Sequence, residues 1–345
     1  VEEMGSYTYE LVVPDIEVPW GMAFLPDGSL LITERVGKLI HFRQGKKTEI
    51  KNLPEIYVRG QGGLLDIQLH PNYPENPWIY LSYASSEGEG KGGHTAIMRA
   101  QLDGDHLVQK EVLYKATPNT TAGQHFGSRI VFDEEGYLYF TIGERGEREV
   151  NPQNLARDGG KTYRLTADGN IPKDNPFLQG ENALKAIYAY GQRNQQGMAV
   201  HPETGKIWIH EHGPMGGDEI NILQKGGNYG WPLVTKGQNY NGTQIDYPGA
   251  TPEMISAIHY WTPSIAPSGM VFVTSAKYPH LKGNLLVGSL KFQYLEHDVL
   301  EGEKVIKREK LLEGIGRVRS VVQGPDGFIY VGVEGLGIVK LIPQQ

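Results

Sequence analysis

The chain has 345 residues, a formal net charge of −7, 45 glycines, 21 prolines and no cysteine. The acidic balance argues against a nucleic-acid partner, and the lack of cysteine excludes disulfides, cysteine nucleophiles and thiolate metal sites. No apolar run approaches the ~18 residues that a membrane-spanning helix needs, so we expect no membrane span.

A short pattern of an apolar strand, a tight turn and a second apolar strand recurs six times along the chain. The copies begin at Gly21, Gly63, Gly127, Gly197, Gly269 and Val318. In each copy we expect two strands joined by a turn in which Asp-Gly, Glu-Gly or Thr-Gly supplies the positive φ. Repeats at intervals of roughly fifty residues indicate a β-propeller in which each copy is one blade. The predicted fold is therefore all-β: a six-bladed β-propeller of four-stranded antiparallel blades, with residues 1–345 as a single domain.

Three segments outside the repeats bear on organisation. Residues 7–13 should pair with the last blade, because closing the ring removes an exposed strand edge. The longest spacers, about 145–196 and 216–267, are more typical of functional loops than of idle ones. The chain opens at Val1 rather than Met, which suggests a removed segment, either a signal peptide or a cloning boundary.

His125 and Glu144 belong to the same copy of the repeat. His125 precedes the first strand in AGQHFGSR, and Glu144 follows the second strand in TIGERGE. A lone histidine is most often structural, but a carboxylate beside an imidazole would fix its tautomer and raise its basicity. The spacing therefore makes the pair a candidate base and orienting acid.

Basic and amide side chains recur at corresponding ends of several blades. Arg193, Asn194 and Gln196 precede the fourth copy, Lys291 ends a strand of the fifth, and Arg317 and Arg319 flank the start of the sixth. Each alone reads as a polar turn or a solvated surface group. Together they would converge on the channel mouth and suit a ligand with several carboxylates.

The segment EHGPMGGDEIN (211–221) has oxygen-rich character. A Gly-Pro at a strand end presents carbonyls suited to a hard cation, and Glu219 could supply a carboxylate to calcium. His210 and His212 share a strand face, but no third ligand for zinc is evident. The run GEGKGG (88–93) fits a dinucleotide-binding pattern but lacks a strand–turn–helix context, so we expect a loop.

Seven motifs, taken in chain order, carry a resemblance to a known family. They are HFGSR, the Gly-Glu after the next strand, YGQRNQQG, EHGPMGGDEIN, NYGWP, SLK and RVR. Together they resemble the soluble quinoprotein glucose dehydrogenase family, most closely its aldose sugar dehydrogenase branch, across essentially the whole chain. The resemblance implies a six-bladed propeller that holds pyrroloquinoline quinone (PQQ), a tricarboxylate, at the channel mouth with calcium, and oxidises aldoses to lactones.

The resemblance also implies a role for individual residues. His125 would be the general base, taking the proton of the anomeric hydroxyl while hydride passes to PQQ, and Glu144 would orient it. The implied cofactor-binding set is Gln61, Arg193, Asn194, Gln196, Tyr240, Lys291, Arg317 and Arg319. The carbonyls of Gly213 and Pro214 would hold the catalytic calcium, and Glu219 with the carbonyl of Tyr229 a structural calcium.

The chain departs from the family pattern at a few positions. Gln195 stands where the family usually has proline, Gln124 stands where the glucose-oxidising branch has an acid, and the loop around Gly88 is short. These differences favour a broad aldose range over strict glucose preference.

Two other functions compete with the dehydrogenase. One is a metal-dependent propeller lactonase or hydrolase, against which the convergent basic residues argue. The other is a non-enzymatic carbohydrate- or protein-binding propeller. For the dehydrogenase we expect a small aldose substrate, a separate electron acceptor, a monomer or weak dimer, and a periplasmic or secreted location.

Overall fold

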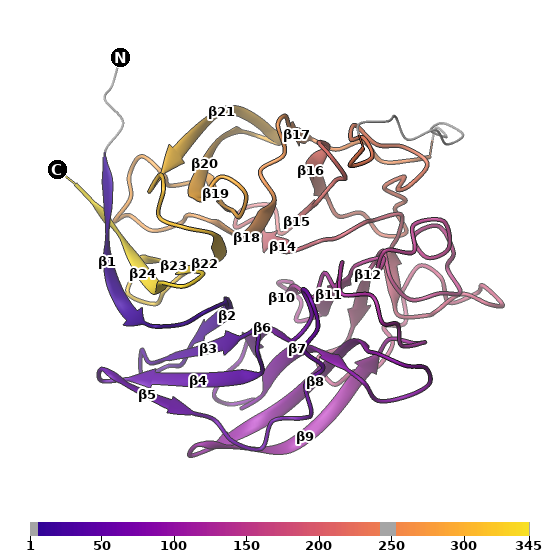
Figure 1. Ribbon diagram of the computed structural model, residues 1–345, viewed down its shortest axis with the longest axis horizontal. Helices are drawn as coiled ribbons and strands as arrows, with labels where there is room; N and C mark the ends of the chain where they lie inside the picture. The colour runs from indigo at the N-terminus through magenta and orange to yellow at the C-terminus, as the bar shows by residue number, and fades with distance from the viewer. Residues whose placement is uncertain (1–5, 242–252, 345) are drawn as a thin grey trace.

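Six four-stranded antiparallel sheets are arranged as blades around a common centre (Figure 1). The structure is a computed structural model that describes residues 6–241 and 253–344, and within these ranges it contains strands and turns but no helix. The predicted all-β fold, a six-bladed propeller of four-stranded blades, is confirmed. No helix in the described ranges is long and apolar enough to cross a membrane.

Each blade runs from an inner to an outer strand, and the blades are numbered here from the first repeat. Blade 1 contains β2 (Pro19–Phe24), β3 (Leu30–Glu34), β4 (Lys38–Arg43) and β5 (Lys46–Glu49). Blade 2 contains β6 (Leu64–Leu69), β7 (Ile79–Ser85), β8 (His94–Asp103) and β9 (His106–Lys115). Blade 3 contains β10 (Ile130–Phe132), β11 (Leu138–Ile142), β12 (Lys161–Leu165) and β13 (Ile187–Ala189). Blade 4 contains β14 (Gly197–Val200), β15 (Ile207–Glu211), β16 (Asp218–Ile222) and β17 (His259–Trp261). Blade 5 contains β18 (Pro267–Phe272), β19 (Leu285–Ser289), β20 (Tyr294–Glu301) and β21 (Lys304–Leu311). Blade 6 contains β22 (Val318–Gln323), β23 (Ile329–Val333), β24 (Gly337–Pro343) and β1 (Tyr7–Pro14).

The repeated sequence pattern corresponds to the two inner strands of each blade. At Gly28 and Gly136 the φ angles are 84° and 87°, so the expected glycine turns join β2 to β3 and β10 to β11. The expectation was wrong for two copies. Residues 70–78 connect β6 to β7 without a glycine, and blade 5 uses Lys282-Gly283 in place of the expected dipeptides.

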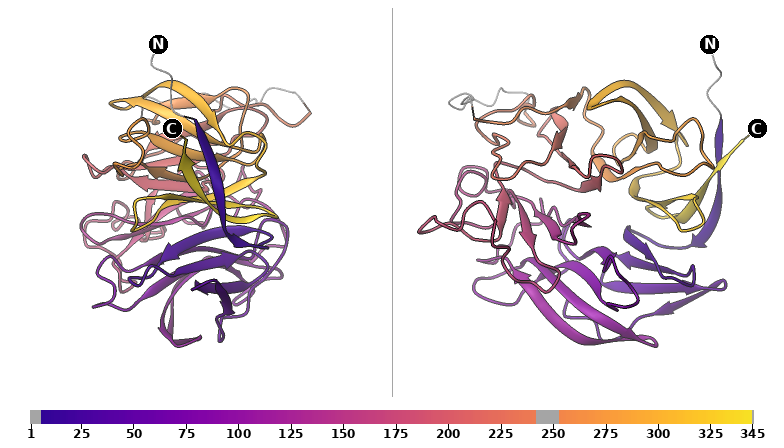
Figure 2. Two further views of the ribbon diagram at one scale, coloured as in Figure 1. Left: turned by 90° about the vertical axis from the view of Figure 1, so that its left-hand side faces the viewer. Right: turned by 180° about the vertical axis from the view of Figure 1, so that it is seen from behind.

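The ring closes through the first strand of the chain. β1 pairs antiparallel with β24, from Tyr7 opposite Pro343 to Pro14 opposite Gly337. Figure 2 shows the two strands side by side from the edge of the ring and from behind it. The predicted pairing of residues 7–13 with the last blade is therefore confirmed, and it covers the edge that blade 6 would otherwise expose.

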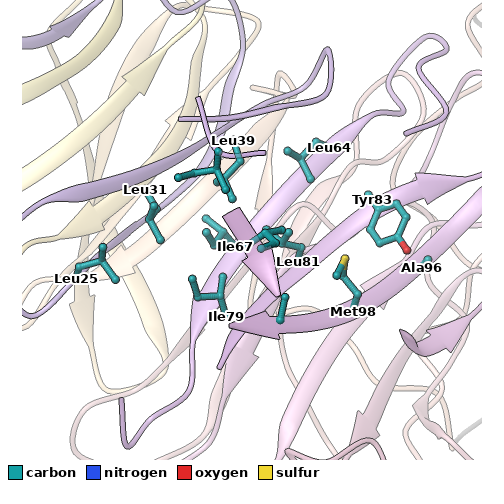
Figure 3. Packing of buried hydrophobic residues seen from close by; sticks show 13 residues of the cluster. Leu25, Leu31, Leu39, Leu64, Ile67, Ile79, Leu81, Tyr83, Ala96 and Met98 are labelled. Carbon is teal, nitrogen blue, oxygen red and sulfur yellow. The ribbon is translucent and has the colours of Figure 1, made fainter. Parts of the chain in front are cut away.

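Apolar clusters fill the space between neighbouring blades. Between blades 1 and 2, Leu31 and Leu39 pack against Ile67, Ile79 and Leu81 (Figure 3). Similar clusters lie between the neighbouring blades of each of the five remaining pairs around the ring. Because burying one such side chain contributes about 1.5–3 kcal/mol, these interfaces hold the inner strands, and the loops at their ends, in fixed positions.

A buried arginine lies at the centre of the ring. The guanidinium of Arg129 stacks over the Trp20 ring at 4.0 Å and is 3.3 Å from the Asp66 carboxylate. It also donates to the carbonyls of Gln196 at 2.7 Å, Trp20 at 3.2 Å and Arg319 at 3.4 Å. These partners come from inner strands of other blades or from the residue just before one. Arg129 therefore joins the blades where the central channel would otherwise be open.

Candidate functional site

A histidine and a glutamate face each other at one end of the inner strands of blade 3. β10 and β11 pair with Ile130 opposite Phe140, which brings the residue stretches that flank them together. His125 Nδ1 hydrogen-bonds Glu144 Oε1, and their side chains are 14% and 2% exposed. His125 has a φ of 57°, an uncommon conformation outside glycine. Its backbone N–H donates to Gln61 Oε1 of the neighbouring blade at 2.9 Å, so the histidine is fixed from two sides.

At neutral pH the glutamate of this pair is charged and the histidine is neutral. Burial lowers the pKa of His125 below its usual 6.5 and the charge of Arg193 lowers it further, against the hydrogen bond to Glu144. Burial opposes ionisation of Glu144, but hydrogen bonds from His125 and the Trp231 indole hold its pKa below the usual 4.5. A carboxylate only accepts, so Nδ1 of His125 carries the proton and Nε2 is left as an acceptor. The pair is therefore able to take up a proton at neutral pH.

The loop before β14 supplies the amides that the sequence singled out. Asn194 accepts the backbone N–H of Gly127 at 3.1 Å through Oδ1. Its Nδ2 is buried and has no hydrogen-bond partner in the described part of the chain. Gln196 accepts Arg319 Nη1 at 2.8 Å. An unpartnered buried amide N–H₂ costs free energy, so Asn194 is poised to donate to an acceptor that is not a protein group.

Two of the predicted cations share a carboxylate that the sequence analysis did not single out. Glu334 accepts Arg317 Nε at 2.7 Å and Arg319 Nη2 at 2.8 Å. Burial opposes ionisation of Glu334, but the two guanidinium groups hold its pKa below the usual 4.5. The arginines are thereby oriented by an ion pair rather than left as free cations.

Several of these groups line one cavity, while His125 lies beside it through its hydrogen bond to Gln61. The cavity has a volume of about 230 Å³. Its lining includes Trp20, Gln61, Phe126, Gly127, Gln196, Arg317, Arg319 and Glu334. A cavity of about 310 Å³ lies along the inner strands and includes Arg129 in its lining. A larger hollow of about 660 Å³ between β1 and β21 contains none of the predicted site residues.

Four members of the predicted cofactor-binding set lie outside this lining: Arg193, Asn194, Tyr240 and Lys291. Lys291 is exposed, with its ammonium 5.2 Å from the centre of the Phe292 ring. Tyr240 is 78% exposed and stands near residues 242–252, which are outside the described ranges. Their assignment to the cofactor therefore stays a prediction from the resemblance.

The carbonyls assigned to the catalytic calcium lie in the turn between β15 and β16. Gly213 donates its N–H to Asp218 at 2.7 Å, and its carbonyl accepts Arg193 Nη1 at 2.7 Å. Pro214 is buried beside it. A carbonyl oxygen has two lone pairs, so Gly213 could still bind a cation while in contact with Arg193.

The residues assigned to the structural calcium meet a second carboxylate. Glu219 on β16 is opposite Glu211 on β15. Burial raises the pKa of both, and for Glu211 the facing carboxylate raises it further. Asn221 donates to Glu219 at 3.1 Å, while its own Oδ1 is buried with no partner among the described residues. Tyr229 is buried close by and donates its hydroxyl to the carbonyl of Ile222 at 2.7 Å. This buried group of carboxylate, amide and hydroxyl oxygens suits a hard divalent cation.

The neighbouring histidines are engaged by the backbone. His210 Nε2 contacts the carbonyl of Ser268, and His212 Nε2 contacts that of Pro267. Burial lowers the pKa of both, that of His210 to about 3. Within residues 6–241 and 253–344, no group of three or more His, Asp or Glu side chains has the arrangement of a metal site. GEGKGG forms the connection between β7 and β8, as predicted.

Sequence reasoning missed three residues of the site: Glu211, Trp231 and Glu334. A signal was available for Glu334, because it follows an inner strand as Glu144 does. Glu211 likewise ends β15. Trp231 lies in the motif NYGWP, but nothing in that motif indicated a contact with Glu144, because the position of Trp231 depends on the path of a long loop.

Four similarities to known proteins cover most or nearly all of the chain. A family model described as glucose/sorbosone dehydrogenase matches residues 16–339. Aldose sugar dehydrogenase YliI of Escherichia coli (strain K12) is 41% identical over 337 residues, covering 95% of this chain and 90% of that protein. The crystal structure of the soluble aldose sugar dehydrogenase of Escherichia coli in the apo-form superposes with a TM-score of 0.92 at 37% identity, covering 98% of this chain and 100% of that one. The PQQ-bound aldose sugar dehydrogenase of Streptomyces coelicolor gives a TM-score of 0.79 at 26% identity, covering 99% of each chain.

Proposed function

The chain belongs to the glucose/sorbosone dehydrogenase family, and from this premise we propose that it is a PQQ- and calcium-dependent aldose sugar dehydrogenase. It oxidises the anomeric carbon of an aldose to the lactone. The relatives named as aldose sugar dehydrogenases, one of them with PQQ bound, support this assignment.

One observation carries the proposal. The His125–Glu144 pair lies beside a cavity that includes Gln61, Arg317 and Arg319 in its lining. His125 Nε2 accepts the proton of the anomeric hydroxyl as hydride leaves the same carbon, and Glu144 holds the imidazolium that results. Positioned proton transfer of this kind contributes ~10²–10⁴-fold to rate.

The residues present fit a tricarboxylate cofactor. Arg317 and Arg319 would engage carboxylates, and the unpartnered Nδ2 of Asn194 would donate to a further oxygen. Arg129 holds the carbonyls of Gln196 and Arg319, which keeps that side of the cavity rigid. PQQ supplies the two-electron acceptor when bound, and calcium at Gly213 and Pro214 supplies a Lewis acid.

The second calcium assignment rests on Glu219 and the carbonyl of Tyr229. The facing, buried Glu211 and the unpartnered Oδ1 of Asn221 support it. A cation here would neutralise two carboxylates that burial otherwise disfavours as anions.

A reconstitution experiment tests the proposed function. Metal-stripped protein is titrated with PQQ and calcium, separately and together, and reduction of a dye acceptor is followed with a panel of aldoses. Activity only with both additions, over several aldoses, is the expected result. Metal-dependent lactone hydrolysis without PQQ would favour the hydrolase, and sugar binding without any PQQ absorbance change would favour the binding protein.

A matched pair of histidine variants tests the base. His125→Ala should lower kcat by about 10²–10⁴-fold while PQQ uptake, followed by absorbance, is retained. His106→Ala is the control, because that side chain is 54% exposed on the outer strand β9. Full activity in His125→Ala would contradict the assigned role.

The broad aldose range, the periplasmic or secreted location and the monomeric or weakly dimeric state are also proposals. A substrate panel, fractionation of cells expressing the full gene, and sedimentation would test them in turn.

A further inference from the structure

Trp231 connects the His125–Glu144 pair to the segment that contains Glu219 and Tyr229, the residues assigned to the second calcium. Its indole N–H donates to Glu144 Oε2 at 3.1 Å, and the residue is only 5% exposed. It follows Tyr229 by two positions, and its own carbonyl accepts Gln153 Nε2 at 2.9 Å. One side chain thus reaches from the long loop of blade 4 to the carboxylate of blade 3.

Three N–H donors are distributed over the two carboxylate oxygens of Glu144. Oε1 receives His125 Nδ1 and the backbone N–H of Gly146, the latter at 2.7 Å. Trp231 is the side-chain donor to Oε2. Without a donor on Oε2 the carboxylate could rotate about its last torsion, which is broad and roughly two-fold. The indole N–H therefore fixes the plane of the carboxylate, so that one oxygen stays directed at the histidine while the other accepts from Trp231.

We propose that Trp231 is a positioning residue of the base: its indole N–H fixes the Glu144 carboxylate and thereby sets how tightly His125 holds a proton. This inference rests on the proposed function, in which His125 is the base. A hydrogen bond to a carboxylate stabilises its charge and weakens its hold on other donors. Removing the indole N–H makes Glu144 a stronger partner for the imidazolium and raises the pKa of His125.

The other charged groups that face His125 are unaffected by this change. They are Arg193 and Arg145, both of which lower the pKa of His125. The Trp231 ring lies 5.5 Å from the Arg193 guanidinium. A phenylalanine at position 231 keeps an aromatic ring beside Arg193 and removes only the N–H donor.

The test compares two tryptophan-to-phenylalanine variants of the full-length chain. Trp231→Phe removes the donor to Glu144. Trp208→Phe is the matched control, because Trp208 is also buried in blade 4 but its Nε1 has no hydrogen-bond partner among the described residues. The imidazole of His125 is titrated by nitrogen-15 NMR, with its signal assigned by its loss in His125→Ala.

We expect the pKa of His125 to rise by about half a unit or more in Trp231→Phe and to stay unchanged in Trp208→Phe. Equal values in wild type and Trp231→Phe, or equal shifts in both variants, would overturn the inference. With PQQ and calcium bound, the pH at which kcat/KM falls on the acid side should move in the same direction as the pKa of His125 measured by NMR.

A measurement on the wild-type protein covers the case in which Trp231→Phe does not fold. Of the five tryptophans, Trp231 should show an indole N–H signal that titrates together with His125, and Trp208 should not. Absence of a coupled indole signal would overturn the inference. Neither NMR readout needs turnover, so coupled titration in an inactive enzyme would refute the proposed function alone. An active enzyme with uncoupled titration would refute only the role of Trp231.

Discussion

Replacing Arg129 by methionine should destabilise the whole ring. The guanidinium is buried, pairs with Asp66 at 3.3 Å and donates to the carbonyl of Gln196 at 2.7 Å. Asp66 keeps the N–H groups of Ile67 at 2.9 Å and Ile130 at 2.8 Å, but it loses its countercharge. Removing one partner of a buried ion pair costs about 3–5 kcal/mol. If the 345 residues unfold as the single unit that the sequence predicts, this lowers Tm by about 4–7 °C.

Calorimetry checks this prediction against a second buried arginine. Arg99 pairs with Glu111 and Asp168, whose side chains are 48% and 72% exposed. Ion pairs with exposed partners are worth about 0–1 kcal/mol, so Arg99→Met should shift Tm far less. Because burial raises the pKa of Asp66 and the charge of Arg129 opposes this rise, Asp66 in Arg129→Met should protonate more readily. The difference in Tm between the wild type and Arg129→Met should therefore become smaller at low pH. Equal losses of Tm in the two variants would refute the reasoning. So would a Tm difference between the wild type and Arg129→Met that grows as the pH falls.

Three further outcomes follow from the buried ionisable groups. In the loaded enzyme, kcat/KM should fall as pH drops through the pKa of His125, which burial holds below 6.5; a fall that begins well above pH 6.5 would contradict a neutral base. Calcium at about 100 times its Kd should stabilise the metal-stripped protein by about 2.7 kcal/mol. The gain in Tm on adding calcium should be smaller in Glu219→Gln than in the control Glu111→Gln, because only the calcium assigned to Gly213 and Pro214 is left to bind, and equal gains in both would exclude the Glu219 site. Finally, burial places the pKa of His94 well below 6.5, so the unfolded state binds more protons below pH 6.5 and stability falls with acid. His94→Gln should flatten this fall in thermal scans, and an unchanged slope would refute the assignment.

The architecture could be predicted because its determinants are local. Each blade begins with two apolar strands that repeat in the sequence, joined in four of the six blades by a tight turn, and β1 pairs with β24 because a ring leaves no other partner for an open edge. The turn chemistry was less predictable. Blade 2 joins its inner strands through residues 70–78 without glycine, so a longer connection replaces the positive-φ turn.

The His125–Glu144 pair could be predicted for the same local reason, whereas the position of Trp231 could not. His125 and Glu144 flank two strands that pair with each other, so their proximity follows from the hairpin. Trp231 comes from the connection between β16 and β17, residues 223–258. Its contact with Glu144 depends on how that connection folds back onto blade 3, and no period of the sequence encodes that path. Tyr240 lies in the same connection, and its role rests on the resemblance alone.

The cavity is not the simple ring of cations that the sequence suggested. Glu334 binds both Arg317 and Arg319, and Arg319 also donates to Gln196. Glu334 offsets the repulsion between two arginines close enough for the charge of Arg317 to lower the pKa of Arg319.

An entering carboxylate must compete with Glu334 for these donors, so it gains the difference between two ion pairs rather than a whole one. A ligand with one carboxylate gains little from that exchange. A ligand with several carboxylates can engage both guanidinium groups at once, which is why a polycarboxylate suits this cavity better than a monoanion.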